Sequence, residues 1–197
     1  MYVPPHFSVP GKETLARLLP TASFAIVVST DEDGLPIATH LPFSYDENRG
    51  ENGTLVAHMA RANPHGKVLE RNEVLVIFQG PHVYISPSYY ATDINVPTWN
   101  YVAVHVYGRP KIIEDPVKVR HLLDRLTLEN EKGTENPWRA DQLDEKRLSG
   151  LMRGIIAFEI PISRIEGKAK LGQNKSAEDQ AAVTSAIGTL WDIAKTD

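Results

Sequence analysis

The segment SFAIVVSTDEDGLPIATHLPF, residues 23–43, places two apolar stretches on either side of a short acidic turn. The first stretch is rich in β-branched residues and predicts a buried strand, and the second predicts a strand that returns beside it. The intervening DEDG is typical of a hairpin turn because Gly34 can adopt a positive φ. Because side chains alternate along a strand, Thr39 and His40 are expected on opposite faces of the returning strand.

Short apolar runs separated by turn signals continue outward from this hairpin along the chain. Further strands are predicted at 54–59, 74–79, 82–86, 98–113 and 153–160, and helices at 11–19, 116–130, 141–149 and 177–195. Asp115 and Ser176 are the expected N-caps of the second and the last of these helices. About seven closely spaced strands with few helices favour a closed barrel over a parallel sheet, so the expected fold class is mainly β with peripheral helices. We expect one domain over residues 1–197.

The composition is that of an ordinary globular protein, with 42% hydrophobic and 23% charged residues. The chain shows no apolar run of membrane-spanning length, no signal peptide and no cysteine. These features predict a cytoplasmic protein without membrane attachment, disulfides or thiolate metal sites. A net charge of −4 argues against a nucleic-acid binder, because such proteins usually carry a basic excess. Lys168, Lys170 and Lys175 are either a solvated surface or a local basic patch that a dimer would double.

The segment HMARANPHGK, residues 58–67, is the most informative one for chemistry. Asn63 followed by Pro64 is a strong signal for the start of a helix, and a helix N-terminus presents unpaired N–H groups that suit a phosphate. Arg61 lies just before this start and Lys67 lies one turn inside it. The pattern predicts a cradle for a phosphate monoester, with an ordinary capped surface helix as the alternative.

Side chains on neighbouring strands add candidates for the same site. Thr39 and His40 can reach the phosphate cradle from the returning strand, although a β-branched Thr39 is also typical of a core position. Gln79 can bond the edge of a heterocycle or the backbone at its strand end. Trp99 can stack on a planar cofactor, anchor a subunit interface or pack at the rim of a barrel.

Several familiar kinds of site are not expected. His40, His58 and His105 can be neighbours on adjacent strands, but the chain has neither HxxxH nor HExxH spacing, so we assign no metal. The absence of GxGxxG, Walker and GxSxG motifs disfavours Rossmann cofactors, P-loop nucleotides and the usual serine hydrolase arrangement. No catalytic residue is assigned.

Matching segments along the chain, taken in order, are MYVPPHF (1–7), IATHLPF (37–43), HMARANP (58–64), VLVIFQGPHVYISPSYY (74–90), NVPTWNYVAVHVYG (95–108), GIIAFEI (154–160) and KLGQNK (170–175). Together they resemble the PaiB family, whose members are described as FMN-binding negative transcriptional regulators. The resemblance implies the FMN-binding split β-barrel fold shared with pyridoxamine-phosphate oxidase-like proteins. In that fold two subunits form a homodimer, barrel to barrel, with flavin mononucleotide (FMN) in the groove between them.

The resemblance also implies which residues contact FMN. They are Arg61, Asn63 and Lys67 on the phosphate, Thr39 and His40 along the isoalloxazine or ribityl region, Gln79 and Trp99 near the ring or the partner subunit, and Gln173 and Asn174 closing the site. Many relatives carry a Trp where His65-Gly66 stands, so we assign no stacking role to this stretch.

The implied function is that of a PaiB-type negative transcriptional regulator. The net charge and the lack of a helix-turn-helix count against direct DNA binding, and regulation through another protein stays open. Two alternatives remain. One is an FMN-dependent oxidoreductase acting on a small substrate, and the other is a flavin-free split-barrel interaction module.

Overall fold

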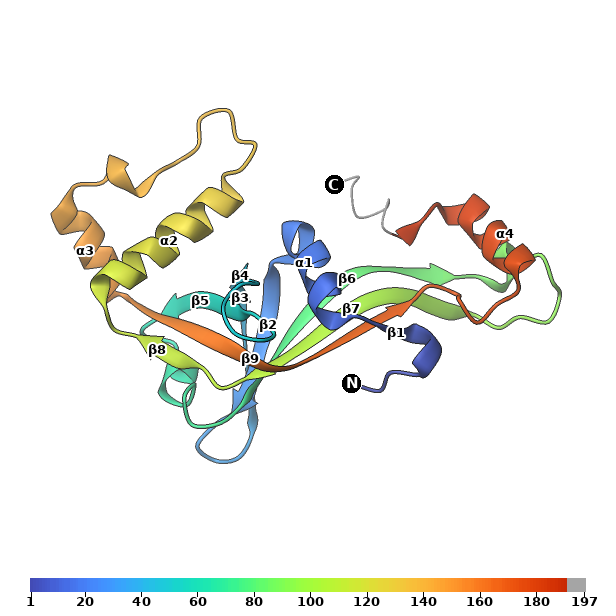
Figure 1. Cartoon of the computed structure of the whole chain (residues 1–197), viewed down its shortest axis with the longest axis horizontal. Coiled ribbons are helices and arrows are strands. Elements are labelled where there is room, and N and C mark those ends of the chain that lie inside the picture. The colour runs from blue at the N-terminus through green and yellow to red at the C-terminus, as the bar shows by residue number, and fades with distance from the viewer. Residues whose placement is uncertain (191–197) are drawn as a thin grey trace. The chain divides into compact units, whose positions relative to one another are not determined.

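The computed structural model describes residues 1–190, apart from the side chains of residues 20–22. Antiparallel strands and short helices make up most of this part of the chain (Figure 1). The strands are β1 (Ser8–Val9), β2 (Phe24–Thr30), β3 (Pro36–Pro42), β4 (Ser44–Asp46), β5 (Thr54–Ala60), β6 (Val74–Ile85), β7 (Thr98–Gly108), β8 (Lys111–Ile113) and β9 (Ile155–Lys170). The α-helices are α1 (Gly11–Ala22), α2 (Pro116–Asn130), α3 (Glu145–Arg153) and α4 (Ala177–Ile187). The 3-10 turns are η1 (Pro5–Phe7), η2 (Pro64–Lys67), η3 (Pro87–Tyr89) and η4 (Ala140–Gln142).

The strands of the described residues form a nine-stranded sheet with the hydrogen-bonded order β3-β2-β6-β7-β9-β5-β4, and β1 and β8 both pair with β9. The chain divides into two compact units. Unit 1 contains Met1–Ala22, Phe78–His105 and the chain from Ile165, and unit 2 contains Ser23–Ile77 and Val106–Arg164. The long strands β6, β7 and β9 each contribute residues to both units. The prediction of a mainly β fold with peripheral helices is confirmed.

The predicted hairpin forms the start of unit 2. β2 and β3 pair antiparallel with Val27 opposite Thr39, and β2 pairs with β6 on its other side. Gly34 in the turn has a φ of 83°, which other residues rarely adopt. Ala25 and Val27 are buried whereas Phe24 is exposed, so one face of the hairpin covers the core.

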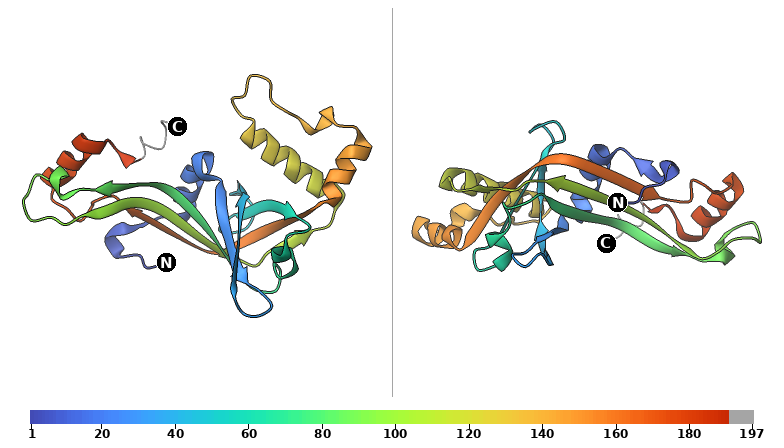
Figure 2. Two further views of the ribbon diagram at one scale, coloured as in Figure 1. Left: turned by 180° about the vertical axis from the view of Figure 1, so that it is seen from behind. Right: turned by 90° about the horizontal axis from the view of Figure 1, so that it is seen from below.

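Helices α2 and α3 pack against each other in unit 2, and α2 shares a buried cluster with β5 and β9 (Figure 2). The predicted start of α2 is confirmed, because the Asp115 carboxylate accepts the backbone N–H of Val117 at 2.9 Å and Pro116 occupies the first turn. Full burial of one aliphatic side chain stabilises a fold by about 1.5–3 kcal/mol. The buried cluster that attaches α2 consists of Val56, Val119, Leu122, Leu126 and Ala157.

Unit 1 carries α1 and α4. α1 buries Leu15 and Leu18, which the sequence places on one helix face. α4 begins at the predicted cap, because the Ser176 hydroxyl accepts the backbone N–H of Asp179 at 3.1 Å. α4 lies beside η3 (Figure 2) and ends at Ile187, so it is shorter than predicted, and residues 191–195 of that prediction lie outside the described residues.

Two predicted strand boundaries are wrong. The sequence predicts separate strands at 74–79 and 82–86, but β6 runs through both. Gly80 lies inside this strand, where an added Cβ would lie 2.7 Å from Cδ2 of Leu18 and 3.1 Å from the carbonyl oxygen of Val102. Conversely, the predicted strand 98–113 is interrupted between β7 and β8, where Pro110 has no N–H for a ladder.

The predicted helix 141–149 is also shifted. α3 begins after Asp144, whose carboxylate accepts the backbone N–H of Arg147 at 2.8 Å, and it continues to Arg153. Among the described residues, no helix combines the length and the apolar character needed to cross a membrane.

Candidate functional site

Arg61 follows directly on β5 in unit 2, and the backbone at the α3–β9 junction holds its guanidinium. Its Nε donates to the carbonyl oxygen of Arg153 at 2.8 Å, and its Nη2 donates to that of Ile155 at 2.7 Å. Arg61 is exposed, and its Nη1 group has no hydrogen-bond partner among the described residues. The side chain is therefore fixed in direction while a planar, charged donor remains available to an anion.

This guanidinium lines a cavity of about 590 Å³ in unit 2. Arg153, Glu114 and Ser149 supply further polar groups. The remaining lining residues are apolar and come from the region of β8, α2, α3 and β9, namely Ile112, Ile113, Pro116, Val119, Met152, Ile155, Ile156 and Ala157. Mostly apolar walls with a few convergent polar groups are the usual form of a small-molecule site.

The predicted helix after Asn63 is η2, a 3-10 turn of four residues. The Asn63 side chain accepts the backbone N–H of His65 at 3.0 Å, and the Asn63 carbonyl accepts that of Gly66 at 3.1 Å. Pro64 has no N–H. The turn therefore lacks the unpaired N–H groups that we expected at these positions, and a phosphate here would depend on side chains. Lys67, at the end of the turn, is exposed and has no partner among the described residues.

A buried histidine ties η2 to the hairpin. His65 is 0% exposed, with its Nε2 at 2.7 Å from the Ser29 hydroxyl and its Nδ1 at 2.9 Å from the Thr39 hydroxyl. The Asn63 amide donates to the same Thr39 oxygen at 3.2 Å. Burial lowers the pKa of His65 below its ordinary value, because the apolar surroundings disfavour the charged imidazolium. The network fixes the position of the turn that follows Arg61.

His40 lies on the other face of β3, as the alternation predicts. Its ring stacks on the exposed ring of Phe24, with centroids 6.1 Å apart and planes at 27°. Thr39 and His40 therefore cannot both contribute from the same face of this strand.

In unit 1, Gln79 and Trp99 are linked through a residue that the sequence reasoning did not single out. The Gln79 amide lies 3.4 Å from Nδ1 of His82, and the rings of His82 and Trp99 are 6.2 Å apart. Tyr84 packs edge-on against Trp99 at 5.9 Å. Trp99 is 53% exposed and Tyr84 is 46% exposed, so Trp99 is not packed away as a rim residue. Period-2 alternation along β6 is the signal that could have grouped His82 with Tyr84.

Gln173 and Asn174 follow β9 in unit 1. The Gln173 amide donates to the carbonyl oxygen of Ala169 at 2.6 Å and accepts the N–H of Leu171 at 2.7 Å, so both its polar atoms close the local turn. Asn174 is exposed and has no partner among the described residues.

The structure thus brings together some of the predicted site residues. In unit 2, the side chains of Asn63 and Thr39 are joined by a hydrogen bond, and Arg61 lies two residues before Asn63 in the sequence. In unit 1, Gln79 and Trp99 share a neighbour. The roles of all the predicted residues toward FMN stay predictions.

His58 on β5 is a further buried group. Its Nδ1 has no hydrogen-bond partner, and burial lowers its pKa below the ordinary value. Within the part of the chain that the structure describes, no group of three or more His, Cys, Asp or Glu side chains could hold a metal ion.

Comparison with known proteins identifies the family. A family model described as "Putative FMN-binding domain" matches residues 1–164. "Protease synthase and sporulation protein PAI 2" of Bacillus subtilis is 40% identical over 191 residues, covering 95% of this chain and 89% of that protein. The FAD and haem binding protein of Mycobacterium smegmatis aligns with a TM-score of 0.61 at 23% identity, over 86% of this chain and 76% of that chain. The flavocytochrome Anf3 of Azotobacter vinelandii aligns with a TM-score of 0.60 at 18% identity, over 86% of this chain and 72% of that chain.

The two structural alignments confirm the split-barrel fold, and the family and sequence matches confirm the resemblance to PaiB. FMN is the cofactor that the family model assigns. The chain therefore belongs to the FMN-binding family of PaiB-type proteins.

Proposed function

We propose that the protein binds FMN with the phosphate on Arg61. The observation that carries this proposal is the guanidinium itself, which two backbone carbonyls hold in place while Nη1 remains available at the cavity wall. The donor chemistry fits the group, because a guanidinium forms strong, directed hydrogen bonds to phosphate oxygens. The apolar walls beside it suit a planar, largely apolar ring system.

Other residues of unit 2 support the same proposal. Lys67 is exposed and unpaired in the described part of the chain, so its flexible ammonium can approach a phosphate as a second charge. The contacts of His65 with Ser29 and Thr39 fix the turn between Arg61 and Lys67. When bound, FMN supplies hydride and electron chemistry, and the protein supplies binding, orientation and exclusion of water.

We also propose that the protein works as a homodimer. Support comes from the exposed aromatic side chains of unit 1, Trp99 and Tyr84, which His82 extends into one surface. Exposed aromatic clusters are typical of interaction surfaces, and Trp and Tyr are enriched among the residues that dominate association energies.

A direct test is an equilibrium titration of FMN fluorescence with the purified protein. The proposal predicts saturable quenching with one FMN per chain and a protein mass of a dimer in light scattering. Unquenched FMN at protein concentrations well above those of cellular flavin would contradict it.

For the biological role we propose negative regulation of transcription, with flavin occupancy altering the dimer and thereby a partner contact. The support is the PaiB resemblance, which the Bacillus subtilis match carries. Where that partner is DNA itself, selection from a random duplex pool, with and without FMN, should enrich a defined sequence whose retention falls with salt. NAD(P)H oxidation by the FMN-loaded protein without such enrichment would favour the oxidoreductase alternative instead.

A further inference from the structure

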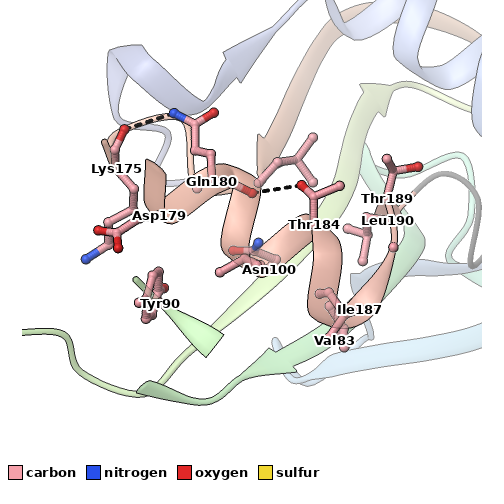
Figure 3. A pocket seen from close by; sticks show the side chains of 14 residues that line it. Val83, Tyr90, Asn100, Lys175, Asp179, Gln180, Thr184, Ile187, Thr189 and Leu190 are labelled. Atoms are coloured by element: carbon pink, nitrogen blue, oxygen red, sulfur yellow. Dashed lines mark hydrogen bonds between the residues drawn. The ribbon is translucent and has the colours of Figure 1, made fainter. Parts of the chain in front are cut away.

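Unit 1 contains a second cavity, of about 200 Å³, beside α4 (Figure 3). None of the residues predicted to contact FMN lines it. Its aliphatic wall is formed by Val83, Leu171, Val183, Ile187 and Leu190. The polar side chains from outside α4 that line it are Tyr90, Asn100, Lys175 and Thr189. The cavity is therefore a separate, amphipathic space whose polar groups need an explanation.

Asn100 is the first of these groups. It lies on β7, is 7% exposed, and its side-chain amide has no hydrogen-bond partner among the described residues. The amide atoms of Asn100 are not among the fully buried, unpaired side-chain atoms of the described residues, so the amide is accessible from the cavity. Because the amide lines the cavity, a molecule inside it is the natural partner.

Lys175 supplies a charge at the same wall. Its Nζ donates to the side-chain oxygen of Asn95 at 2.6 Å and lies 5.0 Å from the ring centre of Tyr90. Neither group is an anion, and an ammonium has three donors, so capacity for a further acceptor remains. Tyr90 also lines the cavity, and its hydroxyl has no hydrogen-bond partner in the described part of the chain.

Asp179 lines the cavity as well, but other groups already occupy its carboxylate. Its Oδ1 accepts the backbone N–H groups of Ala91 and Thr92 at 3.0 and 3.1 Å, and its Oδ2 accepts the Thr92 hydroxyl at 3.0 Å. Burial alone would raise its pKa, yet these hydrogen bonds hold the pKa below the ordinary value. Asp179 thus anchors the loop after η3 and is not available to pair with Lys175.

Three lysines gather near this wall, although the charged residues that line the cavity are one ammonium, Lys175, and one carboxylate, Asp179. The pKa of Lys170 is lowered by burial and by the nearby charges of Lys168 and Lys175. Of these lysines, Lys175 lines the cavity. One ammonium and one amide N–H match the two oxygens of a single carboxylate better than the larger charge of a polyphosphate.

We propose that this cavity binds a small carboxylic acid with an aliphatic or aromatic body. The carboxylate bonds to Lys175 and to the Asn100 amide, and the body packs against Val83, Val183 and Ile187. The site goes beyond the proposed FMN function and does not depend on it. Because Asn100 directly follows Trp99 on β7, an occupant would contact the strand that carries the exposed aromatic surface.

The test is a titration of ¹⁵N-labelled full-length protein with benzoate, followed by calorimetry and by the side-chain amide signals of Asn100 in NMR spectra. The proposal predicts saturable shifts of these signals. Benzamide has the same shape without the charge and should bind to the wild type at least about tenfold more weakly than benzoate. Benzoate should also bind at least about tenfold more weakly to Lys175→Met, which lacks the ammonium, and to Val183→Phe, which fills the cavity. Lys118→Met, at an exposed lysine on α2, should bind benzoate like the wild type.

The same titration with FMN present separates this proposal from the flavin site, since benzoate binding should persist whether or not FMN binds. The proposal is overturned if the Asn100 signals do not shift to saturation, or if Lys175→Met binds benzoate as tightly as the wild type while its spectrum shows an intact fold.

Discussion

Arg61 and His65 use hydrogen bonds in opposite ways. Arg61 is exposed, and backbone carbonyls fix part of its guanidinium while the rest remains unpaired in the described structure. His65 is fully buried, and hydroxyls engage both of its ring nitrogens. The first arrangement suits a side chain that meets a ligand, and the second suits one that positions the backbone around it.

Replacing Arg61 with alanine should weaken FMN binding. Loss of a charged hydrogen bond typically costs about 1.5–3 kcal/mol, which corresponds to an affinity about 10- to 150-fold lower. Fluorescence titration with FMN measures the change in affinity. The matched control is Arg139→Ala, which removes an exposed arginine that pairs only with Asp141 among the described residues. Equal affinities for the Arg61 variant and the control would remove Arg61 from the phosphate site.

His65 should make the fold sensitive to mild acid. Its folded pKa lies below the ordinary value of 6.5, so below that pH the unfolded chain binds more protons than the folded one. The contribution of His65 to stability is complete above pH 6.5 and is lost as the pH falls through that value toward the folded pKa. Tm should therefore drop between about pH 8 and about pH 5.5, and the drop should be smaller in His65→Gln. An identical drop in both proteins would show that His65 does not titrate in this way.

At the scale of elements, the predicted helix caps are confirmed, whereas a local turn signal fails and the long-range contacts are not predicted. Asp115 and Ser176 cap the helices predicted for them, because a cap depends on residues adjacent in sequence. Gln79-Gly80-Pro81 suggests a turn, yet β6 continues through these residues, and a Cβ at Gly80 would lie 3.1 Å from the carbonyl oxygen of Val102. The sequence identifies Arg61 as a phosphate candidate, whereas the Ser29–His65–Thr39 network depends on the register of distant segments.

Glycines provide the sharpest test of element packing. A Cβ on Gly108 would lie 2.4 Å from the carbonyl oxygen of Pro161 and 2.6 Å from Cγ2 of Ile160, so Gly108→Ala should destabilise the fold by about 1–3 kcal/mol. Gly150 lies within α3, and the nearest atom to an added Cβ is 3.8 Å away. Gly150→Ala should therefore stabilise the fold by about 0.5–1 kcal/mol. Urea denaturation measures both, and a harmless Gly108→Ala would contradict the close approach of β7 to β9.

At the scale of the whole molecule, each unit presents its own surface for function. Unit 2 carries the Arg61 cavity, and unit 1 carries the exposed aromatic surface and the cavity beside α4. The family match establishes FMN as the cofactor. The prediction of one domain over residues 1–197 and the homodimer both stay predictions.

Trp99→Ala should loosen the dimer or the bound flavin. The side chain is half-exposed within one chain, so its removal should leave the folded monomer intact while removing an anchor of association. Truncation of a dominant interface residue costs about 2 kcal/mol or more, about a 30-fold loss of affinity. Light scattering at low concentration and the flavin absorption spectrum measure the effect. Trp138→Ala, which removes a 42% exposed tryptophan from unit 2, is the matched control. Unchanged mass and an unchanged spectrum in Trp99→Ala would exclude both roles.

The most direct measurement is calorimetric titration of the purified wild-type protein with FMN and, separately, with riboflavin, which has the same ring but lacks the phosphate. If Arg61 binds the phosphate, FMN should bind at one equivalent per chain and at least about tenfold more tightly than riboflavin, and the difference should disappear in Arg61→Ala. Absence of heat with FMN, or equal affinity for the two flavins in the wild type, would contradict the phosphate site at Arg61.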